Sequence, residues 1–290
     1  MTMSRDNPYR SMIARQAALL QEGKALPLGG IPACDRPVPD KAAGKALIFS
    51  PHPDDECIIG GLALRLQREC GMQVINIAVT QGRHPERQAA RLAELQNACA
   101  FIGFDLLQTA ENGLHDIDLT TRERHPEAWS AAVAVIADIL DAQKPDVIFL
   151  PHDSDWHPAH IGTHHLVLDA LASLPATFAC TVVETEFWAA MATPNLMIES
   201  SPDDVADLAA ALSFHVGEVA RNPYHLRLPA WMIDNVRRGS ELVQGKGEAA
   251  PDMTFATLYR LGRWANGRLQ EVLSKGQVLN ADEDVAGLLT

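Results

Sequence analysis

The chain has 290 residues, 47% of them hydrophobic, which is enough to bury the core of one large α/β domain. Its 24 Lys and Arg residues stand against 37 Asp and Glu residues, a formal net charge of -13. This balance argues against a surface built for nucleic acids or anionic membranes, because both kinds of binding depend on clustered Lys and Arg. A small substrate, neutral or weakly charged, fits the composition better.

The first residues, Met-Thr-Met-Ser-Arg-Asp, do not lead into a continuous apolar signal segment, and no window approaches the ~20 apolar residues of a membrane span. We therefore expect a cytoplasmic protein without a membrane span. The five cysteines contain no C-x-x-C pair, which argues against a disulfide framework and against a thiolate metal site.

Residues 1–44 combine a short amphipathic stretch, about residues 12–20, with several glycines and prolines. This pattern predicts an N-terminal helix followed by an irregular lead-in.

From residue 45 onward, apolar runs typical of buried strands alternate with amphipathic helical patterns. The expected strands are residues 46–49, 73–79, about 106–107, 147–150 and 178–186. The expected helices are residues 57–68, 85–102, 127–142 and 159–174. Such alternation predicts a Rossmann-like α/β fold: an open, mostly parallel sheet with helices on both faces. Ligands of such sheets bind beyond the carboxyl ends of the strands.

Residues 202–290 are predicted to form a mostly helical extension that packs on the same domain. Its expected helices are residues 203–221, 229–243 and 254–275. The core that carries the site would then be residues 45–201.

Metal-ligand residue types are concentrated after two of the predicted strands. Residues 51–56 read Pro-His-Pro-Asp-Asp-Glu, and residues 151–160 read Pro-His-Asp-Ser-Asp-Trp-His-Pro-Ala-His. Imidazole and carboxylate without thiolate is the ligand set of catalytic zinc, which keeps one coordination position open. Of the two adjacent aspartates, one can bind the metal while the other takes a proton from water.

These residues resemble the PIG-L or LmbE-like N-acetylglucosaminyl deacetylases, whose signature is a strand ending in His-Pro-Asp-Asp-Glu with a later His-x-x-His element. The resemblance extends from about residue 46 to residue 201 and includes Thr80-Gln81-Gly82 and Glu186-Phe187-Trp188. It implies zinc-dependent removal of an N-acyl group, most simply acetyl, from a small amino sugar or glycoconjugate.

The resemblance also assigns the metal site and the base. His52, Asp55 and His160 would bind zinc, and Asp54 would be the general base. Other divalent ions, such as iron or manganese, also fit a site of two histidines and one aspartate.

Two further roles follow from the same resemblance. His157 would be a protonated donor to the substrate carbonyl and to the leaving amine, and Arg91 would contact the substrate. Arg91 has an ordinary alternative, because Arg91 and Glu94 could form an ion pair on an exposed helix face.

The chain departs from the family pattern at Ala159, where the family commonly has aspartate. Loss of a carboxylate that orients a metal ligand lowers metal affinity or activity by roughly ten- to a hundredfold. We hypothesise that Asp153, Asp155 or Glu56 compensates.

The remaining histidines are expected to be structural. His164 shares a helical face with His160 and is interpreted as a packing or supporting residue. The other isolated histidines are His84, His115, His125, His215 and His225.

Two other functions remain open at this point. A metal hydrolase acting on a non-sugar amide would use the same residues, with a pocket shaped by the C-terminal third. A non-catalytic ligand-binding protein could keep the metal site and lose turnover, although the presence of Asp54 argues against it. The sequence does not set the number of subunits.

Overall fold

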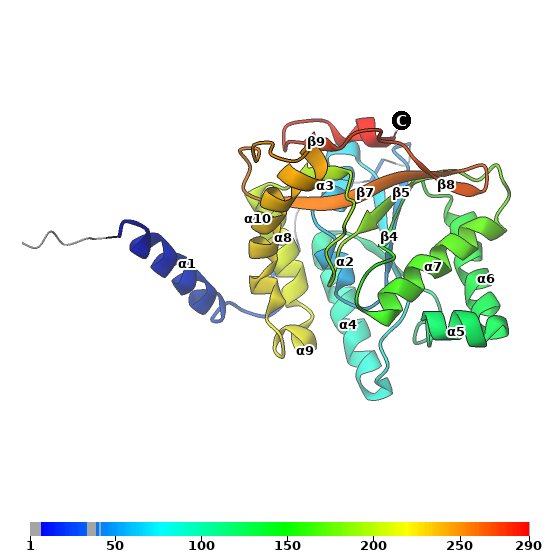
Figure 1. Cartoon of the computed structure of the whole chain (residues 1–290). Coiled ribbons are helices and arrows are strands. Elements are labelled where there is room, and N and C mark those ends of the chain that lie inside the picture. Colours follow the sequence, from blue (N-terminus) through cyan, green and yellow to red (C-terminus); the bar gives the residue numbers. More distant parts are fainter. Residues whose placement is uncertain (1–6, 34–38, 41, 290) are drawn as a thin grey trace, which may run out of the picture.

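The computed structural model describes residues 7–33, 39–40 and 42–289. Within these residues, nine strands form one mixed sheet with helices on both faces (Figure 1). Five neighbouring strands are parallel, in the order β3 (Asp105–Gln108), β2 (Gln73–Ala78), β1 (Lys45–Ser50), β4 (Val147–Pro151) and β5 (Cys180–Thr185). The predicted fold class is confirmed.

The order of the parallel strands brings two loops together. β1 pairs with β2 on one side and with β4 on the other, so the chain winds outward from β1 in both directions. The register places Ser50 beside Ala78, and Ile48 beside Phe149. The loops after β1 and β4 therefore leave the same edge at the point where strand order reverses, which is where open α/β sheets bind ligands.

Alternate residues of each parallel strand face two separate apolar cores, because side chains of a strand point to opposite faces in turn. Ile48 packs with one core, formed with α3 (Leu62–Cys70) and α4 (Pro85–Ile102). Leu47 and Phe49 pack with the other, formed with α6 (Pro126–Gln143) and α7 (Pro158–Ser173). Burial on both faces explains why these strands are almost entirely apolar.

The helix expected at residues 57–68 is divided into α2 (Asp55–Ile58) and α3. Gly60 lies between them with φ 84°, and a Cβ on this glycine would stand 2.1 Å from Thr257 Oγ1. Only glycine fits here, because the backbone is left-handed and approaches the neighbouring strand closely. The short α5 (Leu119–Arg124) precedes α6.

The expectation for the C-terminal segment is partly wrong. Helices α8 (Pro202–Ser213), α9 (Val216–Val219) and α10 (Leu228–Gly239) are present, with a 3-10 turn at Tyr224–Leu226 and a π turn at Ser240–Gln244. The predicted helix at 254–275 is instead a hairpin of β7 (Ala256–Ala265) and β8 (Arg268–Glu271).

The hairpin is explained by Asn266 and Gly267, whose φ angles are 55° and 71°. Positive φ at both central residues is the requirement of a two-residue hairpin turn, and Asn-Gly is its preferred sequence. β7 runs antiparallel between β5 and β6 (Leu196–Glu199), and β9 (Gln277–Leu279) pairs with β6. The last third of the chain therefore completes the sheet, and a 3-10 turn at Val285–Leu289 follows it.

The N-terminal helix is confirmed as α1 (Tyr9–Gly23), which projects away from the rest of the molecule (Figure 1). None of its side chains is buried. Among the described residues, no helix has the length and apolar character needed to cross a membrane.

Candidate metal and catalytic site

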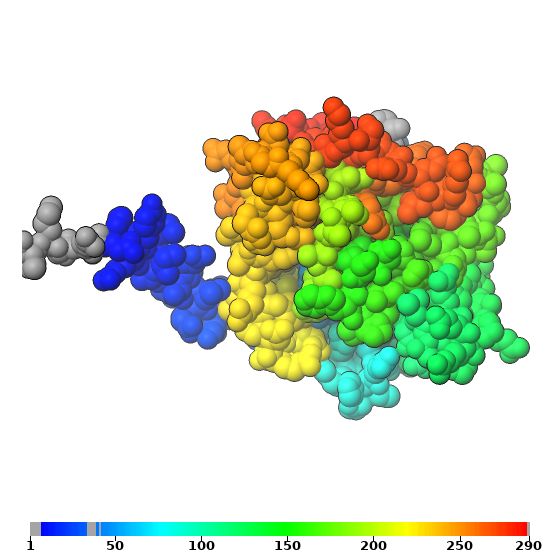
Figure 2. Space-filling model, viewed as in Figure 1, coloured from blue at the N-terminus to red at the C-terminus, as the bar shows by residue number. Residues whose placement is uncertain are grey.

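The loops after β1 and β4 line one side of a cavity of about 810 Å³. The loops after β2 and β3, the start of α4, Trp188 and residues around α9 form the rest of its wall. In Figure 2 the surface is hollowed between the yellow segment of α8 and α9 and the green segment around α7. Binding pockets for small ligands have volumes of roughly 300–1,000 Å³.

Three atoms from these loops form a nearly equilateral triangle. His160 Nε2 lies 3.3 Å from His52 Nδ1 and 3.3 Å from Asp55 Oδ2, and the last two atoms are 3.5 Å apart. Tetrahedral zinc with bonds of ~2.0–2.1 Å separates its ligand atoms by roughly 3.3–3.4 Å. The spacing and the donor types therefore fit a divalent metal ion.

The charges around His160 also favour a cation. Burial lowers the pKa of His160, but Asp55 and Asp155 outweigh it and raise the pKa to about 10. Although burial acts in the opposite direction, His160 and His52 hold the pKa of the Asp55 carboxyl well below its usual range. Asp55 Oδ1 is buried without a hydrogen-bond partner in the protein. The same carboxylates that favour a proton on His160 would favour a metal ion.

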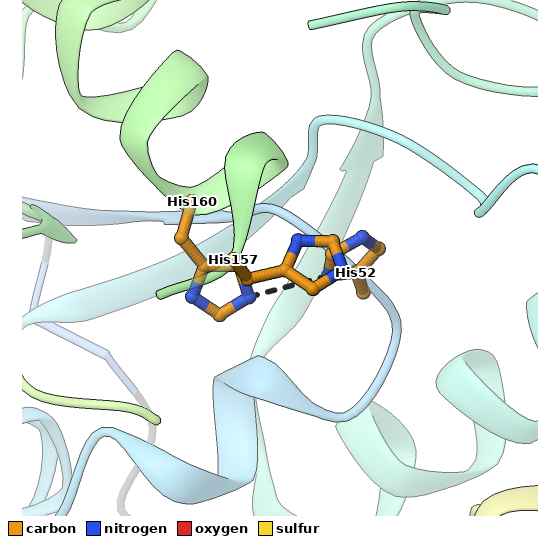
Figure 3. A group of neighbouring side chains, drawn as sticks. All are labelled: His52, His157 and His160. Atoms are coloured by element: carbon orange, nitrogen blue, oxygen red, sulfur yellow. Dashed lines mark hydrogen bonds between the residues drawn. The ribbon is translucent and has the colours of Figure 1, made fainter. Parts of the chain in front are cut away.

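His157 stands beside this triangle (Figure 3). Its ring lies edge-on to His52, with centroids 4.6 Å apart, and ring nitrogens of His52, His157 and His160 lie within 4.8 Å of one another. His157 Nδ1 accepts a hydrogen bond from the backbone N–H of Ala159 at 3.2 Å, which leaves the proton of the neutral ring on Nε2.

The surroundings of His157 act against a proton on its ring. Burial and the neighbouring His52 and His160 lower the pKa of His157 to about 4. The imidazole is therefore neutral near pH 7 in this arrangement, and it can donate only as a neutral N–H.

Asp54 has an unusual backbone held by a buried network. Its φ is 110°, a strained value for a residue with a side chain. The Asp54 N–H donates to Glu56 Oε2 at 2.9 Å, and Glu56 Oε1 accepts from His215 Nε2 at 2.7 Å. Glu56 and His215 are both buried. His215, one of the histidines expected to be structural, supports the loop through an ion pair with Glu56.

The carboxyl of Asp54 is suited to accept a proton near neutral pH. Burial and the adjacent Asp55 raise the pKa of Asp54 to about 7, although His215, Arg91 and a hydrogen bond from Tyr224 act in the opposite direction. The Tyr224 hydroxyl donates to Asp54 Oδ2. Tyr224 comes from the C-terminal third and was not anticipated, because a single tyrosine carries no spacing signal.

Asp155 lies near His160 Nδ1, the ring nitrogen that is not part of the ligand triangle. Asp155 Oδ2 lies 3.7 Å from His160 Nδ1, and Oδ1 accepts from His157 N–H at 2.9 Å. Of the other two candidates, Asp153 lies 3.6 Å from Arg260 and Glu56 supports Asp54. Asp155 is therefore the best placed of the three to orient His160.

Arg91 points into the site. Its Nη2 donates to Pro53 O at 3.0 Å and lies 4.0 Å from Asp54 Oδ2. Glu94, the expected surface partner, accepts a hydrogen bond from Gly217 N–H instead. His164 packs under the loop after β4, with Nδ1 2.9 Å from Pro151 O.

Comparison with known proteins finds a related family. Residues 47–171 match the PIG-L family model, described as GlcNAc-PI de-N-acetylase. This part of the chain is similar to the PIG-L family. The resemblance inferred from the His-Pro-Asp-Asp-Glu loop is thereby confirmed.

One curated relative is 1D-myo-inositol 2-acetamido-2-deoxy-alpha-D-glucopyranoside deacetylase from Corynebacterium jeikeium, 29% identical over 49% of this chain. The chain spans about half of that relative's length, 54%.

Two solved structures share the fold. N,N'-diacetylchitobiose deacetylase from Pyrococcus horikoshii has a TM-score of 0.55 at 17% identity, covering 86% of this chain and 92% of that one. The 4-carboxy-2-hydroxymuconate hydratase GalB from Pseudomonas putida has a TM-score of 0.53 at 16% identity, covering 75% and 95%. The second likeness shows that this fold also occurs in an enzyme named for a different reaction, so the chemistry must be argued from the site.

Proposed function

We propose that this protein is a metal-dependent N-deacetylase, with zinc as the metal, that acts on a small N-acylated amino sugar or glycoconjugate. The observation that carries the proposal is the triangle of His52, Asp55 and His160 atoms with a separate carboxylate, Asp54, beside it. The likeness to the PIG-L family and the names of the deacetylase relatives support the substrate class.

His52, Asp55 and His160 would hold the ion. When bound, a metal ion of this kind acts as a Lewis acid toward a carbonyl and lowers the pKa of water. Asp155, behind His160, would keep that imidazole oriented.

Asp54 would act as the general base. With a pKa of about 7, its carboxylate can take a proton from the attacking water and later return it to the departing nitrogen. The oxygen of water bonds to the acyl carbon, the carbon–nitrogen bond breaks, and acetate and a free amine are formed.

His157 would stabilise the negative charge that develops on the carbonyl oxygen. The hydrogen bond from the Ala159 N–H uses Nδ1, so the Nε2–H can donate to the substrate. A donor placed where charge develops contributes about 3–4 kcal/mol to transition-state stabilisation. Arg91 would contact the sugar from the wall of the cavity.

The test is amine release from a panel of N-acetylated sugars and non-sugar amides, with metal-depleted and zinc-reloaded protein compared directly. We expect release from amino-sugar amides only after reloading. If the best substrate is an amide without a sugar, the proposed substrate class is wrong but the proposed reaction, amide hydrolysis, stands. If no amide is hydrolysed by metal-loaded protein, the proposal fails and a ligand-binding role takes its place.

A further inference from the structure

The aliphatic side chains that line the cavity are gathered on one side of it. Leu114 and Ile117 belong to the loop after β3, and Pro158 and Ala159 begin α7. We call these four residues the aliphatic wall. Because apolar surface is stabilised when it is removed from water, such a wall favours an apolar part of a ligand.

Close packing of the backbone joins the two parts of the aliphatic wall. A Cβ added to Gly162 of α7 would stand 2.2 Å from Ile117 O and 2.8 Å from Asp118 Cα. Pro158 and Ala159 precede Gly162 by four and three residues, so they lie on the same side of the helix. The start of α7 is therefore held against the loop after β3.

The aliphatic wall begins beside the reaction centre. His157, the donor proposed for the carbonyl oxygen, immediately precedes Pro158, and Nδ1 of its ring accepts the Ala159 N–H at 3.2 Å. An acyl chain that extends from a carbonyl at His157 toward α7 would therefore meet apolar side chains.

The side of the cavity formed by α4 and α9 is polar. Arg87 and Arg221 each donate to a different oxygen of Glu218, and Arg91 lies 4.0 Å from Asp54. An alkyl chain on this side would remove water from charged groups, which costs free energy, whereas sugar hydroxyls can form hydrogen bonds with them. The two sides of the cavity thus suit the two ends of an N-acylated amino sugar, the sugar toward α4 and α9 and the acyl chain toward α7.

Parts of the aliphatic wall remain accessible for a ligand to cover. Ala159 and Leu114 are partly exposed, and Ile117 is buried. His115 and Asp116, which also line the cavity, are exposed and border the wall with polar groups. An aspartate at position 159, common in the family, would put a charge in this wall, whereas alanine leaves it apolar.

We propose that the aliphatic wall binds the acyl chain of the substrate, and that this chain is an alkanoyl group longer than acetyl, such as butanoyl. This inference rests on the proposed function for the hydrolysis and names the acyl group that the reaction removes. Water adds its oxygen to the acyl carbon, the carbon–nitrogen bond breaks, and butanoate and a free amine are formed.

The test compares amine release from N-acetyl-, N-propanoyl- and N-butanoylglucosamine by zinc-loaded protein. Each methylene group buried against the wall should raise kcat/KM about two- to fourfold. The value for N-butanoylglucosamine should therefore exceed that for N-acetylglucosamine by roughly tenfold.

Ala159→Asp should remove this preference, because an alkyl chain against the new carboxylate would take water from a charge. The fold should tolerate the change, since aspartate is favourable in the first turn of a helix. The matched control is Ala172→Asp, which adds the same charge at an exposed position near the other end of α7 and outside the cavity lining. The ratio of the butanoyl and acetyl values is the readout, because a loss of folded or metal-loaded protein lowers both values together.

The inference is overturned if N-acetylglucosamine is hydrolysed as well as the longer amides, or if Ala159→Asp and Ala172→Asp give the same ratio. Release of amine from the acetyl compound would still support the proposed function in either case. If no amide of this series or of the panel is hydrolysed, the proposed function fails and the inference fails with it.

Discussion

The two parts of the chain contribute to the site in different ways. Residues 45–201 supply the groups for the chemistry, which stand on loops after parallel strands and are grouped in sequence. Residues 202–289 supply single residues from short helical segments that pack against those loops: His215, Glu218, Arg221 and Tyr224. The reactive groups therefore follow a pattern that the sequence shows. The residues that support the base and line the α9 side of the cavity depend instead on how the C-terminal segment packs.

The first variant removes one residue of the C-terminal part that supports the loop carrying Asp54. His215→Ala takes away the partner of Glu56, which holds the strained Asp54 backbone. We expect kcat to fall by up to roughly 10²-fold, because displacement of a catalytic group by about 1 Å has an effect of this size. Metal content should stay unchanged, because His215 does not touch the ligand atoms. Steady-state rates and metal analysis measure both.

The control for this variant is His225→Ala. His225 is another buried histidine of the C-terminal part, and burial alone lowers its pKa. If His215→Ala and His225→Ala lose the same activity and the same thermal stability, His215 is a packing residue and the comparison fails. Glu56→Gln, which keeps the side chain's shape, offers a second variant that should also lower kcat.

A smaller effect is expected on the pH dependence. A base with a pKa of about 7 must lose its proton to work, so kcat/KM should rise with pH through about 7. The hydrogen bond from Tyr224 favours the ionised form and lowers the pKa of Asp54. Tyr224→Phe should therefore move the acidic limb of the profile to higher pH.

Tyr259→Phe is the matched control, because Tyr259 is also contributed by the C-terminal part and its hydroxyl is buried against Ile59 O at 2.7 Å. This variant should lower the thermal stability and leave the acidic limb of the pH profile unchanged. An unmoved limb in Tyr224→Phe would mean that Tyr224 does not act on Asp54.

The parallel half of the sheet could be predicted because its strands are buried on both faces and read as apolar runs. The bounds of α4 match the expected helix at residues 85–102. The prediction of a helix at residues 254–275 was wrong because Asn266-Gly267 forms a hairpin turn that joins two strands. Gly60 was missed as a break, since its close neighbour Thr257 is remote in sequence.

The candidate site, like the fold, could be predicted only in the parts that are grouped in sequence. The three ligands were assigned from the resemblance to the PIG-L family, and they lie together because both loops begin at the ends of neighbouring parallel strands. Glu56, which supports Asp54, has as its partner His215, which lies 159 residues away and carries no local signal. Three arginines around Glu218 could not be foreseen, because Arg87, Arg91 and Arg221 meet only after α9 packs beside α4.

The most direct test of the account compares the two adjacent aspartates. Asp54→Asn and Asp55→Asn each remove one negative charge from neighbouring positions, and zinc content and amine release are measured for both. The account predicts that Asp54→Asn keeps its zinc and loses about 10²–10⁴-fold in rate, the contribution of a general base, whereas Asp55→Asn loses its zinc together with its activity. Equal zinc loss in both variants, or an Asp54→Asn protein with near wild-type turnover, would contradict the division into one ligand and one base.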